Sequence, residues 1–235
     1  MYRVSDLYKY KEILKNPLHH KETKIDISGV EYGEENIISA SIPFVGLYES
    51  FGIGNCVSRE LDLEIIPIGE IPKQAQIKIS QRLVFESDVS EWIPQGVFFI
   101  STRKKDKVTG NLVITAFDAM LKAEEIWVNS DYYLENWPLS QESAVNDIAH
   151  RMDVGIDERT SLSDSFPVDY PVDENGDLTM REVLSGIAVS NAGNWVISNE
   201  GNLLLIGAVD IPAETSYLVN ESGSPITFGG VRIIA

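Results

Sequence analysis

Apolar and polar positions alternate with a period of two along most of the first half of the chain. This alternation predicts β-strands in which one face is buried. The predicted strands are residues 24–29, 36–44, 58–66, 75–85, 97–102 and 111–117. The glycine-containing stretch 29–35 is expected to be a turn, and a basic turn joins the last two strands. Five or six such strands within about 120 residues indicate a sandwich or a small barrel.

A helix is predicted on each side of this strand region. Residues 5–15 predict a short helix that Ser5 or Asp6 can cap and that Asn16 and Pro17 end. A second helix is expected directly after the strand at 111–117, running to Glu125.

The second half of the chain changes to helical spacing. Ser140 can cap a helix, and Thr179 with Glu182 fits a capping box before another. Their apolar stripes are Ala144, Val145, Ile148, Ala149 and Met152 in the first helix, and Val183, Leu184, Ile187 and Ala188 in the second. Gly193 is expected to end the second helix. Residues 194–198 and 202–207 then predict a hairpin that turns at Gly201.

These elements predict an α+β fold, with an N-terminal β-barrel-like domain followed by a small helix-helix-hairpin α+β domain. We place the first domain at residues 1–127 and the second at 128–210, with 128–139 as a linker. Residues 211–235 are expected to be C-terminal strands that return to the first domain or lead into a missing barrel. Because 226–235 reads as a strand with an apolar end, the natural polypeptide is expected to continue.

Composition fits a globular protein with an unusual charge distribution. The 235 residues are 43% hydrophobic, enough for a core in one large domain or two small ones. The net charge of −17 repels phosphate backbones and argues against generic nucleic-acid binding. Yet residues 1–24 carry six basic against three acidic residues, and 157–177 carry one against seven. Opposite patches favour ordered assembly with partners or with copies of the chain; two solvated surfaces are the alternative.

Targeting and cysteine signals are sparse. No run of 18 or more apolar residues occurs, so no membrane-spanning helix is expected. The N-terminus lacks the features of a secretory signal. The single cysteine, Cys56, suits a reducing cytosol and excludes thiolate zinc sites, which need two or more cysteines.

The histidines do not assemble into a recognisable site. His19 and His20 are adjacent, so in an extended segment they point to opposite sides, and a polar loop is favoured over a metal site. His150 lies near Asp147 and Asp153 in a predicted helix. Because the chain has no G-x-S-x-G turn for a nucleophile, we interpret His150 as a surface residue of the helix.

Other candidate motifs also fail. The acidic run 173–177 resembles a calcium loop, but Leu178 and Leu184 occupy the positions that require Gly and Glu, so a turn is expected. Gly52 and Gly54 lack the continuation of a dinucleotide-binding loop. The four tryptophans are dispersed and are interpreted as packing residues: Trp92, Trp127, Trp137 and Trp195.

A basic cluster is expected at the tip of the hairpin 97–117. Its members are Arg103, Lys104, Lys105 and Lys107. It lacks the interleaved aromatic residues that single-strand binders use for stacking, which leaves a solvated tip or a docking point. We therefore assign no catalytic, cofactor-binding or metal-binding residue and expect no cofactor and no enzyme. A structural or assembly protein is what remains.

The order of the motifs resembles the tail-hub proteins of phages and related contractile particles. This baseplate-hub group includes minor tail proteins and the N-terminal structural part of tail-associated lysins. The stretches that carry the resemblance are 1–17, 24–42, 51–65, 96–125, 138–156 and 178–206, and together they cover most of the chain. The hairpin and helix at 96–125 is the most specific of them.

The resemblance implies a structural hub protein at the tip of a phage tail or phage-derived particle. It implies a homotrimer whose ring links the tail tube to the tip and to receptor-binding or lytic parts. Its expected partners are tail tube or distal tail proteins, the tape-measure protein, and baseplate or tip proteins. The resemblance also implies a lumen through which DNA can pass without specific binding. The expected location is the virion tail, after synthesis in the host bacterial cytoplasm.

Two alternatives stay open, and the chain departs from the family in one respect. A β domain with exposed aromatic residues would suit a carbohydrate- or receptor-binding tail module. The chain would also suit a fragment of a peptidoglycan hydrolase. It ends where the family continues into a second tube barrel, which leaves open whether it closes a complete ring alone.

Overall fold

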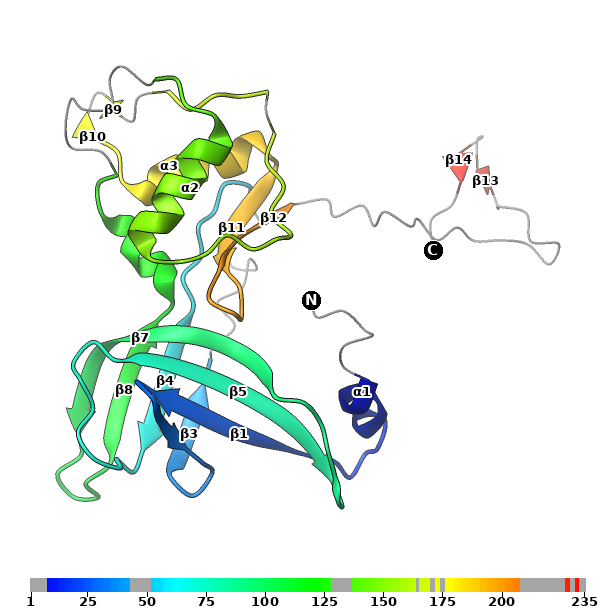
Figure 1. Ribbon diagram of the computed structural model, residues 1–235, viewed down its shortest axis with the longest axis vertical. Coiled ribbons are helices and arrows are strands. Elements are labelled where there is room, and N and C mark those ends of the chain that lie inside the picture. The colour runs from blue at the N-terminus through cyan, green and yellow to red at the C-terminus, as the bar shows by residue number, and fades with distance from the viewer. Residues whose placement is uncertain are drawn as a thin grey trace.

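The computed structural model describes residues 8–42, 52–127, 137–163, 165–169, 172–173, 176–207, 227–228 and 231–232. The fold is mixed α/β and consists mostly of strands. A curled, half-barrel sheet forms one body, and a smaller body of helices and a hairpin lies beside it (Figure 1).

The half-barrel is one antiparallel sheet. Its strands are β1 (His20–Ile27), β2 (Val30–Tyr32), β3 (Ile37–Ser41), β4 (Glu60–Ile65), β5 (Gln76–Phe85), β6 (Asp88–Val89), β7 (Ile93–Lys105) and β8 (Leu112–Phe117). They are ordered β2-β1-β5-β7-β8-β4-β3, and β6 pairs with β5. The end strands β2 and β3 are not paired with each other, so the described sheet stays open. The predicted strands are confirmed within the described residues, although β7 is longer than the predicted 97–102, and residues 43–44 of the predicted strand 36–44 lie outside the described part. The predicted hairpin β7–β8 is confirmed.

Alternation places the first core on the concave face of the sheet. Leu61, Leu63 and Ile65 of β4 are buried together with Ile77 and Ile79 of β5. The polar residues between them face outward, as period-two alternation requires. Register shifts in the pairing of β7 with β5 and with β8 add to the bend of the sheet.

The second body has a separate core under two helices. Its elements are the 3-10 helix η1 (Ala119–Glu124), α2 (Gln141–Met152), α3 (Met180–Ser190), β11 (Gly193–Ile197) and β12 (Leu203–Gly207). Ser140 caps α2, and Thr179 with Glu182 forms the predicted capping box of α3. The predicted apolar stripes of both helices are buried in this core. Within the described ranges, no helix has the length and apolar content to cross a membrane.

The short peripheral elements are α1 (Tyr8–Leu14), β9 (Val172–Asp173), β10 (Gly176–Asp177), β13 (Thr227–Phe228) and β14 (Val231–Arg232). The expected caps Ser5 and Asp6 lie outside the described residues. The prediction of one strand over 226–235 is wrong in the described part, because β13 and β14 pair with each other. They join neither of the two larger sheets.

Two local expectations need correction. The stretch 29–35 is more than a turn, since Val30–Tyr32 form strand β2 and bury Tyr32 in the core. Gly193 begins β11 instead of ending α3, and the chain reverses one residue earlier at Ala192, with φ of 49°. A Cβ on Gly193 would lie 2.7 Å from the carbonyl oxygen of Ile206, so close strand packing requires glycine here.

The predicted linker 128–139 is described only from Trp137 onward. Trp137 and Leu139 pack against the second core, so this end is part of the folded body. The domain boundary at residue 127 stays a prediction. The second core already includes Ala119, Met120, Ala123 and Trp127, so the two hydrophobic cores meet near Asp118.

Candidate functional site

In the described part of the chain, histidine and acidic side chains do not gather into a metal site. Within the described ranges, no three His, Cys, Asp or Glu side chains lie close enough to hold a metal ion. The Nε2 of His20, at the start of β1, lies 3.9 Å from a carboxylate oxygen of Glu22. His19 places its Nδ1 beside the carbonyl oxygen of Asn16.

His150 is an exposed residue of α2, as predicted. Asp147, one turn earlier, has a structural role. It accepts hydrogen bonds from Trp127 Nε1 at 2.7 Å and from Arg151 Nε at 2.8 Å. This carboxylate therefore anchors a buried tryptophan and forms an ion pair along the helix.

Two stretches that the sequence analysis rejected as calcium or dinucleotide sites have structural roles. Val172 pairs with Asp177 across the short antiparallel β9–β10 ladder, and residues 174–175 of the acidic run lie outside the described residues. Gly54 has φ of 93°, and an added Cβ would meet Val189 of α3 at 2.5 Å. This glycine is needed for close packing of the chain on α3.

The tryptophans are packing residues. Trp127 and Trp195 are buried in the second core, which confirms the prediction for them. Trp137 stacks edge-on against Trp127, with ring centroids 5.3 Å apart. Trp92 is half-buried on the sheet, with Lys24 Nζ 4.8 Å and the Arg82 guanidinium 4.5 Å from its ring centroid. These cations cover part of the ring, so it does not form an open aromatic platform.

A buried carboxylate, Asp118, lies where the two cores meet. Its side chain is fully buried and caps η1 by accepting a hydrogen bond from the backbone nitrogen of Met120 at 3.1 Å. It also accepts hydrogen bonds of 3.0 Å from the Ser58 hydroxyl and from the backbone nitrogen of Arg59. Burial raises the pKa of Asp118 above its ordinary value, although these hydrogen bonds oppose the shift.

Arg59 extends this cluster across the junction. Its guanidinium lies 3.5 Å from the Asp118 carboxylate and donates to the carbonyl oxygen of Gln95 at 3.2 Å. It also donates to the side-chain oxygen of Asn199 at 2.8 Å and to the carbonyl oxygen of Ser198 at 3.3 Å. One side chain thus binds the sheet and the β11–β12 turn together.

Arg181 of α3 makes a second connection. It donates hydrogen bonds to the backbone carbonyls of Cys56 and of Met120, and its Nε lies 2.6 Å from the Glu124 carboxylate. Cys56 in turn forms a parallel bridge with Trp195 of β11. Burial raises the pKa of the Cys56 thiol to about 12, so the thiol stays protonated at neutral pH.

These contacts hold the junction together, because Asp118 is hydrogen-bonded and paired with Arg59, and Arg181 is paired with Glu124. The sequence prediction missed these residues, since Arg59 and Asn199 are 140 positions apart. The one local signal was Asp118, an N-cap residue type between a predicted strand and a predicted helix.

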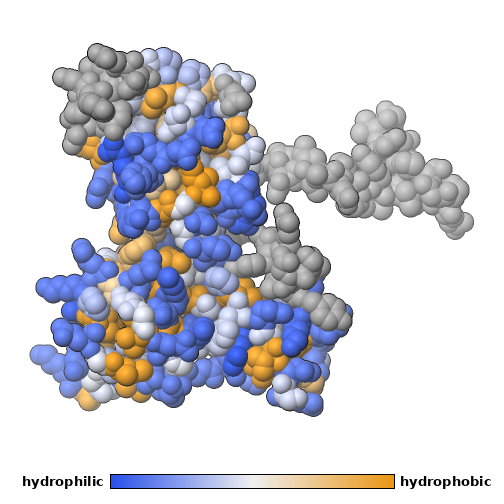
Figure 2. Space-filling view, in the orientation of Figure 1, coloured by the Kyte–Doolittle hydropathy of each residue, from blue (hydrophilic) through white to orange (hydrophobic). Residues whose placement is uncertain are grey.

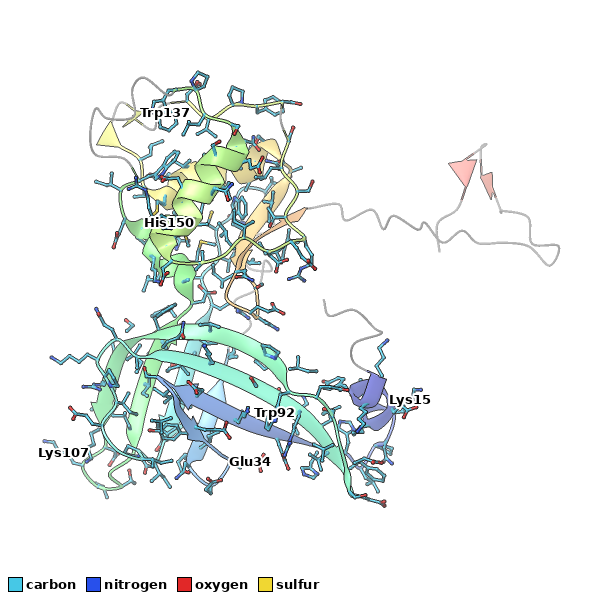
Figure 3. The ribbon with its side chains drawn as sticks, viewed as in Figure 1. Lys15, Glu34, Trp92, Lys107, Trp137 and His150 are labelled. Atoms are coloured by element: carbon cyan, nitrogen blue, oxygen red, sulfur yellow. The ribbon has the colours of Figure 1, made fainter. Side chains whose placement is uncertain are left out.

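The basic cluster was expected at the tip of the hairpin, and this placement is wrong for three of its four residues. Arg103, Lys104 and Lys105 belong to strand β7, and only Lys107 lies in the turn at the end of the hairpin (Figure 3). Asp106 starts the turn by accepting hydrogen bonds from the backbone nitrogens of Val108 at 2.7 Å and Thr109 at 2.9 Å. These bonds lower the pKa of Asp106.

The surface of the sheet is mainly polar, with small apolar patches between (Figure 2). On β4, Glu60, Asp62 and Glu64 alternate with the buried leucines and line the convex face. The neighbouring edge strand β3 is exposed from Ile38 onward. A cleft of about 490 Å³ separates β3 from β1 and β5, with Glu34, Ile38 and Gln81 among its lining residues.

Comparison with known proteins gives a match at the level of fold. No protein-family model matches the sequence, and no curated protein matches it. The prophage MuSo2 43 kDa tail protein from Shewanella oneidensis superposes with a TM-score of 0.55 and 14% identity, over 84% of this chain and 59% of that one. A tail protein from Neisseria meningitidis MC58 gives a TM-score of 0.48 and 13% identity, over 88% of this chain and 58% of its own.

The chain spans about three fifths of the length of these two solved structures. The first likeness shows a fold shared with a prophage tail protein. This agrees, for the fold, with the phage-tail resemblance of the sequence.

Proposed function

We propose that this chain is a structural, non-enzymatic component of a phage or prophage tail. In this proposal it is a hub at the tail tip, where three copies form a ring between the tail tube and the tip proteins. The observation that carries the proposal is the fold shared with the MuSo2 tail protein over 84% of the chain. The order of the sequence motifs supports the hub position.

The junction between the two cores supports a mechanical role. A subunit that positions neighbours must keep its parts in a fixed orientation. Arg59 binds groups of both bodies, and Arg181 joins α3 to η1 and to the chain at Cys56. Their partners Asp118 and Glu124 neutralise them. Such a network gives rigidity without a reactive group.

The overall charge supports a place around a DNA channel. A net charge of −17 repels the DNA backbone, so nucleic acid can pass a ring of these chains without sticking. The tape-measure, tail tube and baseplate proteins are the partners in this proposal.

Deletion of the coding sequence from the phage or prophage that carries it tests the proposal. We expect heads and incomplete tails without a functional tip, and recovery of infectious particles when the chain is supplied in trans. Intact, infectious particles from the deletion strain would overturn the tail role.

A second assay separates this role from the two alternatives. The purified chain is incubated with purified bacterial cell wall. We expect neither retention on the wall nor release of soluble fragments. Saturable retention would indicate a carbohydrate-binding module, and fragment release would indicate a hydrolase.

A further inference from the structure

Strand β3 is an open edge of the half-barrel. Among the described strands, only β4 pairs with it. Four of its five residues are exposed. The strand contains no Lys, Arg or Pro, the residues that commonly protect an edge from pairing. After a bulge near Ile38, Ser39–Ser41 follow a regular register, so their outer edge offers backbone groups to a further strand.

An acidic row lies directly behind this edge. Glu64 of β4 is opposite Ser39, and Asp62 is opposite Ser41. Neighbouring strands lie about 4.8 Å apart, so a strand added to β3 would be two such spacings from β4. Because serine is small, a lysine on the added strand can reach over it to these carboxylates. The edge therefore suits a basic strand.

The far end of β7 is a second open edge, with the opposite charge. β5 pairs with β7 only as far as Phe99, and the backbone nitrogen of Ile100 donates to the carbonyl oxygen of Ala75. Beyond this point only β8 pairs with β7 among the described strands. Ser101–Lys105 are all exposed and contain three basic residues and no acid.

Side-chain alternation places Lys104 on the convex face. It is opposite Val113, which is itself opposite Glu64. Asp62 and Glu64 face the same side of the sheet, so continuing the sheet from one copy to another would bring Lys104 onto their side. Within one copy, β8 and β4 separate β7 from β3, so the two edges cannot pair with each other.

We propose that Ser101–Lys105 of one copy adds as a strand to β3 of a second copy, with Lys104 directed over the serines toward Asp62 and Glu64. The contact joins two different surfaces, so it is head-to-tail and can repeat around a ring. It rests on the proposed function and names the surfaces through which copies of the chain meet.

Charge reversal tests this contact in the purified chain, with self-association measured by sedimentation velocity. We expect Lys104→Glu/Lys105→Glu and Asp62→Lys/Glu64→Lys each to weaken association at least tenfold. The variant with all four changes should recover it in part, because the charge reversed at Lys104 again faces the opposite charge at Asp62 and Glu64, whereas Lys105 lies on the other face. Lys21→Glu/Lys78→Glu is the matched control: both lysines are exposed on β1 and β5, and association should be unchanged.

Several results would overturn the contact. They are a wild-type chain that stays monomeric at high concentration, association that survives both reversals, and no recovery in the fourfold variant whose circular dichroism spectrum is that of the wild type. Association through other surfaces would leave the tail role intact. Conversely, infectious particles from a strain that lacks the chain would rule out the proposed tail function. The contact between copies could still be measured in solution.

Cysteine cross-linking gives an independent test if a charge variant folds poorly. Cys56 is replaced by Ser, and Ser41→Cys and Thr102→Cys, which lie on the same face of the sheet, are introduced singly and together. Within one copy these positions are three strand spacings apart, about 14 Å, too far for a disulfide. We expect covalent dimers and trimers after mild oxidation only in the double variant. No covalent species, or dimers from a single variant, would overturn head-to-tail pairing.

Discussion

The guanidinium of Arg59 donates a 2.8 Å hydrogen bond to the side-chain oxygen of Asn199, which lies 140 residues later in the chain. Arg59 immediately precedes β4 of the half-barrel, and Asn199 lies in the turn between β11 and β12. The same guanidinium also pairs with buried Asp118. The orientation of the two bodies therefore depends on a few long-range polar contacts, and these can be tested singly.

Arg59→Ala should destabilise the protein by about 3 kcal/mol, because it leaves the buried Asp118 carboxylate without its cation. Asn199→Ala should cost about 1 kcal/mol, the typical value of one hydrogen bond. Urea unfolding followed by tryptophan fluorescence measures both. Arg82→Ala, which breaks a part-exposed ion pair with Glu22, is the control and should cost less than about 1 kcal/mol. Equal effects of Arg59→Ala and Arg82→Ala would contradict the role of the junction.

The junction should also make the two bodies unfold together. With Trp92 of the sheet replaced by Phe in every variant, fluorescence reports on the second core through Trp127 and Trp195, whereas the half-barrel contributes most of the strand signal in circular dichroism. We expect the two signals to give one urea midpoint in the wild type and separate midpoints in Arg59→Ala. Separate midpoints in the wild type would mean that the junction does not couple the cores.

Asp157 should make the free energy of unfolding depend on pH in the acidic range. Hydrogen bonds from Arg159, at 2.7 and 2.6 Å, lower the pKa of Asp157 to about 2. Because this is below its ordinary value of 3.8, the carboxylate stabilises the fold above pH 3.8, and the effect is lost as the pH falls toward 2. Asp157→Asn should cost about 1 kcal/mol at pH 7 after solvent screening.

The measurement is the free energy of unfolding of wild type and Asp157→Asn between pH 2 and 7. The difference between them should shrink below pH 4. Glu158→Gln, an exposed neighbour with the same change of charge, serves as the control. A difference that stays constant down to pH 2 would show that the carboxylate charge is unimportant.

Cys56 should be nearly inert in the folded protein. Its thiol, with a pKa raised to about 12 by burial, holds little thiolate at pH 8. Alkylation by iodoacetamide should therefore be slower than in urea by on the order of a hundredfold or more. Mass spectrometry over time gives both rates. Rapid modification of the native chain would show that the thiol is open and ionised.

Reversal of Lys104 and Lys105 to Glu should block particle assembly and leave the monomer folded. Both side chains are exposed on β7, so their loss removes no buried contact. Infectious titre and circular dichroism of the purified variant measure the two effects. Normal titres from particles that carry the variant would refute a role for this basic strand in assembly.

Local features of the fold could be predicted from the sequence. Ser140 and Thr179 act within three residues of themselves, so their caps are readable from spacing alone. Strands β4 and β8 could also be predicted, because period-two alternation is likewise a local pattern.

Long-range features could not be predicted. Strand β2 has only three residues, too few for a pattern, and forms because it pairs with β1. Gly193 has the residue type of a helix end, but the packing of β12 against it decides its place in a strand. The Arg59 cluster and the open edge of β3 depend on strand order, which a single sequence does not contain.

An electron cryomicroscopy map of the intact particle tests the central claim most directly, namely that the chain works as a repeated structural subunit at the tail tip. The account predicts three half-barrels of this shape around the tail axis, between the tube and the tip proteins. Particles whose complete tail lacks density for this chain, and whose protein content by mass spectrometry also lacks it, would contradict the account.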